Sequence, residues 1–357
     1  MQPGSVRHAG APIRIAAALA ATAPFHPDPP DPPDPFRAAH RHIPLRASPC
    51  LGRRAGLTGT AMDLAKTFDI TKNFVKAKRP CADGFRWFIR HHHEGSNYQE
   101  LLDALVAAGR VNDACWLLDQ FGPTDGVLAV DSLGADAIVF AGTLEVRGNI
   151  EADTLIRAGR SIVAGGSIRA GTALVAGEDV KAGGGLRCDG AARVGGDLRV
   201  EWGVDCAADL AVGGDLRAAW EVQVGGDLRV DGSAYLGQDL VVAGPVYCGK
   251  SLRAGGSIAG ADTVRAGSGI VAGGDIRAAR HLEAGWGIRA GGDMAAEGAI
   301  RAGESLHAQG EIRAGSGFGI FAGLDVAVES WDASARVCAV ARPEALMSGC
   351  WAGACPV

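Results

Sequence analysis

The six-residue stretch Gly195-Gly-Asp-Leu-Arg-Val200 recurs almost unchanged at residues 213–218 and again at residues 225–230. Stepping by six from Ile138 to Leu324 visits 32 positions, of which thirty carry Ile, Leu, Val, Met or Phe and two carry Ala. A second series, two residues after the first, is apolar everywhere except Gly260. A period kept over this length without an insertion indicates a repeat architecture.

The pattern within one unit predicts a short β-strand followed by a corner. Side chains alternate between the two faces of a strand, so the bulky residue and the one two positions later point inward. The residue between them points outward, and it is Arg thirteen times. Gly follows the second inward residue in seventeen units, where we expect it to turn the corner with a positive φ.

These features predict an all-β solenoid, a single-stranded parallel β-helix of triangular cross-section over residues 138–326. Six residues per face and three faces give about 18 residues per coil, so residue i lies under residue i+18 at about 4.8 Å. About ten coils would make a rod some 50 Å long. Cys188 and Cys206 would then stack inside one face, and Trp202 and Trp220 would stack at one corner.

Residues 142–153 and 226–232 resemble the bactofilins, the bacterial polymer-forming cytoskeletal proteins. The resemblance implies a right-handed triangular β-helix that associates end to end into filaments. This chain differs in having a helical segment before the repeat and in the greater length of the repeat. The hexapeptide acyltransferases share the six-residue period, but there a bulky residue usually precedes Gly, whereas here that position is mostly Ala or Val.

Composition narrows the classes of protein. With 53 Gly but 47% hydrophobic residues, the chain fits an ordered repeat better than collagen or a disordered tract. A net charge of −5 argues against a general nucleic-acid binder, and no apolar run is long enough to span a membrane. The nine Cys include no CxxC pair, which favours a reducing, cytoplasmic setting.

Residues 1–61 contain seven Arg, no Lys and no Glu, and include a proline-rich run at 26–36. We interpret them as a disordered leader, or as upstream sequence before a true start at Met62. The alternative is secretion, because a weak signal-like segment lies near residues 14–25.

Residues 62–122 predict a small α-helical module. Leu101, Leu102, Leu105 and Ala108 share one face of a helix that Gly109 ends. Asn112 would cap the next helix. An earlier helix would end near the three consecutive histidines at residues 91–93, which suit a solvated helix end better than a metal site. Residues 123–137 would be a connector, and residues 327–357 a capping segment.

We predict no catalytic, cofactor-binding or metal-binding residue, and therefore no enzyme. Gly244-Pro-Val-Tyr-Cys-Gly-Lys-Ser251 matches the P-loop pattern, but it continues the repeat where a P-loop needs a helix. His281 and His307 would point outward, with no loop beside them to form a pocket.

Outward residues taken at 18-residue steps form one row, which we call the basic row. Its members are Lys181, Arg199, Arg217, Tyr235, Arg253 and Arg289, followed by His307 and broken by Val271. The basic row could meet an anionic polymer or a membrane surface. Alternatively, Asp179, Asp197 and Asp215 neutralise it and the two rows stabilise the sheet. Trp202 and Trp220 could anchor a partner or simply stack on each other.

Three functions remain open from the sequence. The first is a structural or scaffold protein whose rod self-assembles or displays rows of residues for binding. The second is a binding module or secreted effector that recognises a protein or glycan. The third, an acyltransferase, would need a trimer to create clefts between rods.

Overall fold

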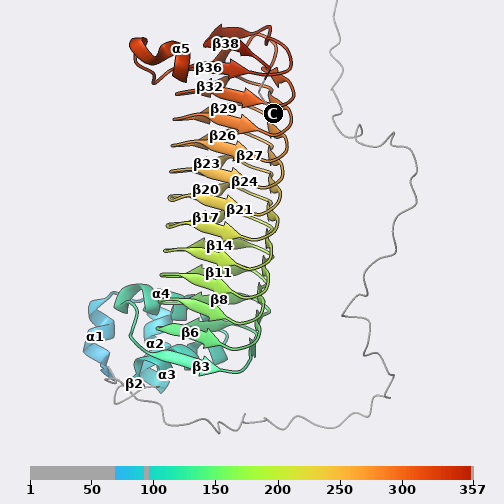
Figure 1. Ribbon diagram of the computed structural model, residues 1–357. Helices are drawn as coiled ribbons and strands as arrows, with labels where there is room; N and C mark the ends of the chain where they lie inside the picture. The colour runs from blue at the N-terminus through green and yellow to red at the C-terminus, as the bar shows by residue number, and fades with distance from the viewer. Residues whose placement is uncertain (1–68, 92–95, 355–357) are drawn as a thin grey trace, which may run out of the picture. The chain divides into compact units, whose positions relative to one another are not determined.

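The computed structural model describes residues 69–91 and 96–354, so the predicted leader lies outside the described residues. A small group of helices comes first and is followed by a long parallel β-solenoid (Figure 1). The solenoid has about 13 turns of about 18 residues each. The predicted fold class is therefore confirmed. No helix among these residues is long and apolar enough to cross a membrane.

Three parallel sheets form the walls of the solenoid, and each coil contributes one strand to each sheet in turn. Sheet 1 contains β3 (Val127–Val130), β6 (Thr143–Val146), β9 (Ile162–Ala164), β12 (Val180–Ala182), β15 (Leu198–Val200), β18 (Leu216–Ala218), β21 (Ala234–Leu236), β24 (Leu252–Ala254), β27 (Ile270–Ala272), β30 (Ile288–Ala290), β33 (Leu306–Ala308), β36 (Arg336–Cys338) and β38 (Cys350–Gly353). Sheet 2 contains β4 (Leu133–Ala135), β7 (Ile150–Ala152), β10 (Ile168–Ala170), β13 (Leu186–Cys188), β16 (Val204–Cys206), β19 (Val222–Val224), β22 (Leu240–Val242), β25 (Ile258–Gly260), β28 (Ile276–Ala278), β31 (Met294–Ala296) and β34 (Ile312–Arg313). Sheet 3 contains β5 (Ile138–Phe140), β8 (Leu155–Ala158), β11 (Ala173–Ala176), β14 (Ala191–Val194), β17 (Leu210–Val212), β20 (Leu228–Val230), β23 (Val246–Cys248), β26 (Val264–Ala266), β29 (Leu282–Ala284), β32 (Ile300–Ala302), β35 (Ile320–Phe321) and β37 (Leu346–Ser348).

The core is a narrow column of stacked aliphatic side chains. Every step-of-six position from Ile138 to Ile312 is buried, and so is every second-series position from Val146 to Ala308. Pairing is in register at 18 residues, as where Leu198 lies opposite Leu216. Because a slip of one residue would turn these side chains to solvent, the hydrophobic pattern fixes the register.

The exact repeat ends sooner than the sequence pattern suggested. Ile300 pairs with Ile320, two residues beyond the 18-residue step, and Phe318 and Leu324 are exposed although both were predicted to point inward. A turn causes the shift: the backbone N–H of Phe318 donates to the carbonyl of Gly315, and Gly317 has φ of 79°.

The solenoid is also longer than the ten coils predicted. Strands begin at Val127, within the segment expected to be a connector. At the other end β36 and β38 extend sheet 1, and β37 extends sheet 3, beyond the point where the repeat was expected to stop. The first coil is short, since Val127 pairs with Thr143. A spacing of about 4.8 Å makes about 13 coils some 60 Å long.

The corner glycines serve a different purpose from the one predicted. Among the described residues a positive φ occurs only at Gly outside the regular corners and at Arg79. A Cβ on the corner residue Gly195 would instead lie 2.1 Å from the carbonyl oxygen of Gly177, one coil away. Glycine is favoured at this position because a Cβ there would clash with the backbone of the neighbouring coil unless that backbone shifted.

The helical module consists of α1 (Lys72–Ala77), α2 (Ala82–His91), α3 (Tyr98–Ala107) and α4 (Val111–Phe121), with β1 (Asp69–Ile70) paired antiparallel to β2 (Ser96–Asn97). Leu101, Leu102 and Leu105 are buried as predicted, but Ala108 is exposed as the residue that caps α3. Asn112 does not cap α4, because Arg110 occupies the cap position. The side chain of Asn97 caps α3 by accepting from the N–H of Gln99.

This module packs on the outer side of sheet 3 at the first coils. Val139 and Ala141 of the solenoid share a buried apolar cluster with Leu102 and Leu118. The Gln99 side chain donates to the carbonyl oxygen of Val139 at 3.1 Å and accepts from the N–H of Ala141 at 2.9 Å. Its amide thus takes the place that a further strand would hold beside β5.

After β35 the described residues keep only part of the repeat geometry. The 3-10 helix η1 (Val328–Ser330) and α5 (Trp331–Ser334) interrupt the solenoid before β36. Within the described residues, β34, β37 and β38 are the last strands of their three sheets.

The close approach of coils predicts unequal costs for two glycine substitutions. A Cβ at Gly214 would lie 2.3 Å from Oδ1 of Asp197, whereas a Cβ at Gly185 would meet the carbonyl oxygen of Gly203 at an ordinary 3.5 Å. We expect Gly214→Ala to destabilise the solenoid by about 1–3 kcal/mol and Gly185→Ala to be close to neutral. Thermal unfolding followed by circular dichroism measures both, and equal melting temperatures would contradict this account of the glycines.

Candidate functional site

The six residues of the basic row lie on the outer face of sheet 1, each paired in register with its neighbours one coil away. Lys181 pairs with Arg199, Arg199 with Arg217, Arg217 with Tyr235, and Tyr235 with Arg253. Val271 lies between Arg253 and Arg289. The structure therefore brings all six residues into one continuous row.

Acidic side chains beside the row are held by the backbone. Oδ1 of Asp179 accepts from the N–H of Asp197 at 2.8 Å, and Oδ1 of Asp197 accepts from the N–H of Asp215 at 2.9 Å. A glycine precedes Asp197 and Asp215, and a Cβ on that glycine would collide with the carboxylate one coil away. The repeated Gly-Gly-Asp thus makes room for a carboxylate and lets it bond the next coil.

The second carboxylate oxygen of these residues faces the row. Oδ2 of Asp197 accepts from Arg199 at 2.9 Å, and Oδ2 of Asp215 accepts from Arg217 at 3.2 Å. The pKa of Asp197 is held below its ordinary value, first by the hydrogen bond from the Asp215 N–H and then by the Arg199 and Arg217 guanidinium groups. The expected neutralisation is therefore present, but it covers only this half of the row.

In the other half of the row, from Tyr235 to Arg289, the residue before each strand is not acidic. The residues that precede its strands are Ser233, Ser251, Gly269 and Gly287. Among the described residues, Arg253 and Arg289 form no ion pair. His307 lies beyond Arg289, and its pKa is lowered by burial and by the charges of Arg289 and Arg336. The row thus changes from a compensated to a positively charged half.

Trp202 and Trp220 lie one coil apart at the corner between sheets 1 and 2. Their ring centroids are 6.3 Å apart with the rings stacked, as the 18-residue period predicted. Both side chains remain more than half exposed. Exposed tryptophans are common anchors of protein interfaces, so the pair is an accessible apolar edge beside the basic row.

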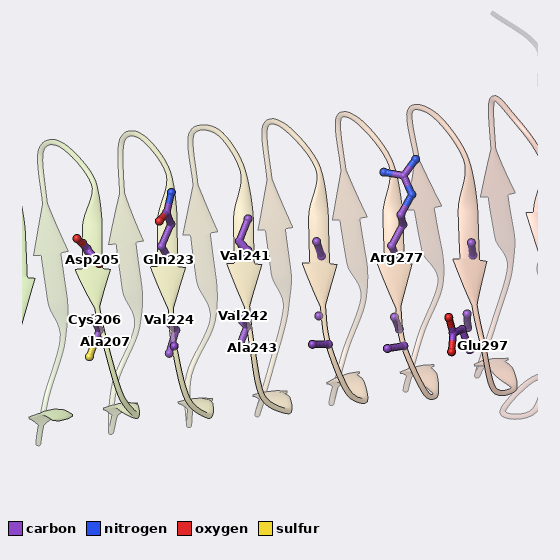
Figure 2. Close-up of a pocket in the computed structure, with 18 of the residues that line it drawn as sticks. Asp205, Cys206, Ala207, Gln223, Val224, Val241, Val242, Ala243, Arg277 and Glu297 are labelled. Carbon is purple, nitrogen blue, oxygen red and sulfur yellow. The ribbon is translucent and has the colours of Figure 1, made fainter. Parts of the chain in front are cut away.

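A shallow groove of about 750 Å³, which was not expected from the sequence, lies on sheet 2 (Figure 2). Its floor consists of Val241 and small residues such as Ala259 and Ala295. Asp205 lies toward one end, and Arg277 and Glu297 lie toward the other. Arg313, on the last strand of sheet 2, also lines the groove. The short side chains of Val241, Ala259 and Ala295 leave room at outward positions of sheet 2, although Arg277 lies between the last two. This pattern becomes visible in the sequence once coils are aligned at 18 residues.

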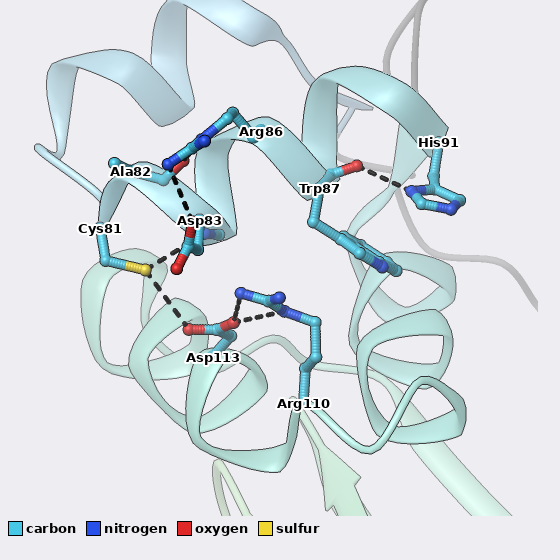
Figure 3. A network of polar contacts seen from close by, with 9 residues as sticks. Cys81, Ala82, Asp83, Arg86, Trp87, His91, Arg110 and Asp113 are labelled. Carbon is cyan, nitrogen blue, oxygen red and sulfur yellow. Dashed lines mark hydrogen bonds and ion pairs between the residues drawn. The ribbon is translucent and has the colours of Figure 1, made fainter.

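Polar contacts in the helical module form a separate cluster (Figure 3). Asp113 pairs with Arg110 and accepts a weak hydrogen bond from the Cys81 thiol. His91 stacks on Trp87, and its Nδ1 lies 2.8 Å from the Trp87 carbonyl oxygen. His92 and His93 lie outside the described residues. The Cys81–Asp113 contact links the residue before α2 to α4, whereas the Arg110–Asp113 pair lies at the start of α4 and the Trp87–His91 contacts lie within α2.

Other sequence candidates fall into the repeat. Lys250 of the P-loop-like segment is followed by strand β24, where a phosphate-binding loop requires a helix. Nδ1 of His281 accepts from the N–H of Ala299 one coil away, the same role that the aspartates have. No group of three or more metal-ligating side chains occurs among the described residues.

The buried cysteines lie inside the column. Cys188 pairs in register with Cys206, and the Cys206 thiol donates to the carbonyl of Gly190 at 3.1 Å. The pKa of the Cys206 thiol is raised by its contact with Cys188 and by burial. Burial likewise raises the pKa of Cys248. These thiols pack as small apolar side chains and are not exposed nucleophiles.

Comparison with known proteins matches one segment. Residues 62–121, which include the helical module, match the family model of the YdhT N-terminal domain. No curated protein and no solved structure matches the chain. The match stops at the point where the solenoid begins.

The aspartate bonds lead to a prediction about local stability. Asp197→Ala removes the acceptor for the Asp215 N–H, which should cost about 1–2 kcal/mol and lower the protection of that amide about 5- to 30-fold. Since the pKa of Asp197 is depressed in the folded chain, wild-type protection should persist as pH falls to the ordinary Asp range and be lost only below it.

Hydrogen exchange read by mass spectrometry measures this effect. Asp205→Ala is the matched control, because Asp205 lies on the outer face of sheet 2 and contacts Arg187. Equal loss of protection in the two variants would show that the backbone bond to Asp197 contributes nothing specific.

Proposed function

We propose that this protein is a non-enzymatic structural scaffold, a β-helical rod that associates end to end with further copies of itself. The proposal rests on the regular coils from β6 to β34 and on the state of the terminal strands. It also agrees with the bactofilin resemblance of the repeat. Long loops, which in other β-helical proteins frame a reaction site, do not interrupt the regular coils from β6 to β34.

The C-terminal end carries the main observation. Within the described residues, β34, β37 and β38 each have a neighbouring strand on one side only. Such edges offer unpaired N–H and C=O groups to another chain. The last coils also hold a concentration of exposed apolar side chains, namely Phe318, Leu324, Val328, Val340 and Met347. Exposed apolar groups beside open strand edges favour association.

The N-terminal end is less available for pairing. Gln99 already bonds the free side of β5, while β3 and β4 each pair with one strand among the described residues. The helices therefore protect one of the three sheets. We infer that copies join first through their C-terminal ends, giving a pair of rods before any longer assembly.

A second function, a binding module for a protein or glycan, is favoured by the groove on sheet 2 and by the exposed pair Trp202 and Trp220. This function needs no self-association. The two proposals therefore differ in how the mass of the particle depends on concentration.

Light scattering and electron microscopy of the full chain over a range of concentrations test the scaffold. We expect mass to rise to that of two chains and images to show paired rods. Met347→Lys together with Val340→Lys should weaken association at least about tenfold. Met347 lies in the terminal strand β37, where lysine opposes pairing, and Val340 is an exposed apolar residue just beyond β36. Val241→Lys, on the side of the rod and 49% exposed in the wild type, is the matched control.

The results distinguish a C-terminal from an N-terminal contact, and the scaffold from the binding module. Val127→Lys in β3 should not affect the first association step, and a loss of paired rods in that variant would transfer the contact to the N-terminal end. A single chain at every concentration would refute the scaffold and leave the binding module.

A further inference from the structure

Between Arg217 and Arg289, arginine occupies every second outward position on sheet 1. Arg217, Arg253 and Arg289 alternate with Tyr235 and Val271, each in register with the next. Coils are about 4.8 Å apart, so successive arginines in this series are about 9.6 Å apart. Val271 is therefore part of a two-coil alternation of charged and apolar positions.

This segment is the part of the row that its surroundings leave charged. Arg253 and Arg289 have no ion-pair partner among the described residues, whereas Arg217 pairs with Asp215 at 3.2 Å. Sheet 3 has arginines at the same two-coil spacing, but there Arg229 pairs with Asp231, and Glu283 contacts Arg301 and Arg265. Sheet 1 thus offers the less compensated ladder.

Few polymers carry charge at a matching interval. A polyproline II helix rises about 3.1 Å per residue with three residues per turn, so every third side chain lies on one face at about 9.3 Å. A β-strand repeats its face at about 6.7 Å and an α-helix completes a turn at about 5.4 Å. Over the four coils from Arg217 to Arg289, about 19 Å, six polyproline residues span about the same length.

We propose that the outer face of sheet 1, from Arg217 to Arg289, binds an extended proline-rich peptide with a carboxylate at every third residue. The peptide lies along the solenoid axis in the polyproline II conformation. Its carboxylates meet the arginines, whose planar guanidinium groups suit carboxylates.

The apolar positions between the arginines complete the match. Tyr235 is 37% exposed, and the Arg217 guanidinium lies 5.5 Å from its ring centroid. Proline-rich ligands dock on surfaces lined by aromatic side chains, and their preformed helix loses little entropy on binding. Tyr235 and Val271 therefore face the prolines that lie between successive carboxylates.

The chain's own sequence supplies a suitable probe. Residues 26–36 read His-Pro-Asp-Pro-Pro-Asp-Pro-Pro-Asp-Pro-Phe, with Asp28, Asp31 and Asp34 at every third position. A fluorescent synthetic peptide of this sequence is titrated with the full chain, and binding is followed by anisotropy. The full chain carries Asp28→Asn, Asp31→Asn and Asp34→Asn, so that its own copy of the pattern does not compete.

Two chain variants test the spacing against charge alone. Arg253→Gln with Arg289→Gln should weaken binding about tenfold or more, from two lost carboxylate contacts. Exchanging the two central residues by Arg253→Val with Val271→Arg keeps the net charge but breaks the two-coil interval, and it should weaken binding at least about fivefold. Arg169→Gln, an exposed arginine on sheet 2, should have no effect.

A second probe keeps composition and changes the interval. A peptide of the same residues with its three aspartates adjacent should bind at least about fivefold more weakly. The proposal fails if the exchange variant binds as the wild type does, or if both peptides bind equally. It also fails if polygalacturonate, an anionic polysaccharide, binds more tightly than the peptide and its binding is unaffected by the exchange.

Discussion

Stacking of coils at the spacing of paired parallel strands is the constraint on which the rest of this structure depends. Because each backbone lies about 4.8 Å from the next, a Cβ at Gly195 would strike the carbonyl of Gly177. The same proximity lets Asp197 accept the N–H of Asp215. Each residue type in Gly-Gly-Asp-Leu thus suits this spacing. Glycine allows the close contact between coils, aspartate bonds the backbone of the next coil, and leucine fills the core.

This constraint explains which features could be predicted from the sequence. Burial at every sixth residue depends only on the register. The six-residue period and the 18-residue coil therefore predict the sheets, the core and the alignment of the basic row. The positive φ expected at the corners was wrong, because steric clash between coils and backbone strain at a turn both select glycine. The bonds from Gln99 to β5 depend on where a helix packs, and no local pattern carries that information.

Repetition also limits what an outer face can be. Outward side chains on one sheet form a ladder in which neighbours are one coil apart. The identity of the side chains therefore determines the interval at which charges recur along a face. Arg199 and Arg217 have their charge reduced by the aspartates that also bond the backbone. Once serine and glycine replace those aspartates, beside Arg253 and Arg289, charge on the ladder becomes available to a ligand of matching period.

Each regular coil pairs with a coil on either side, and the first and last coils cannot. The two ends of the solenoid differ in what takes the place of the missing coil. At the first coils Gln99 supplies two hydrogen bonds that a strand would otherwise supply, and Val139 is buried against the helices. At the last coils the two-residue shift after Ile312 turns Phe318 and Leu324 outward. The repeat thus loses its register close to the open edges, and apolar side chains that the sequence pattern placed in the core are exposed there.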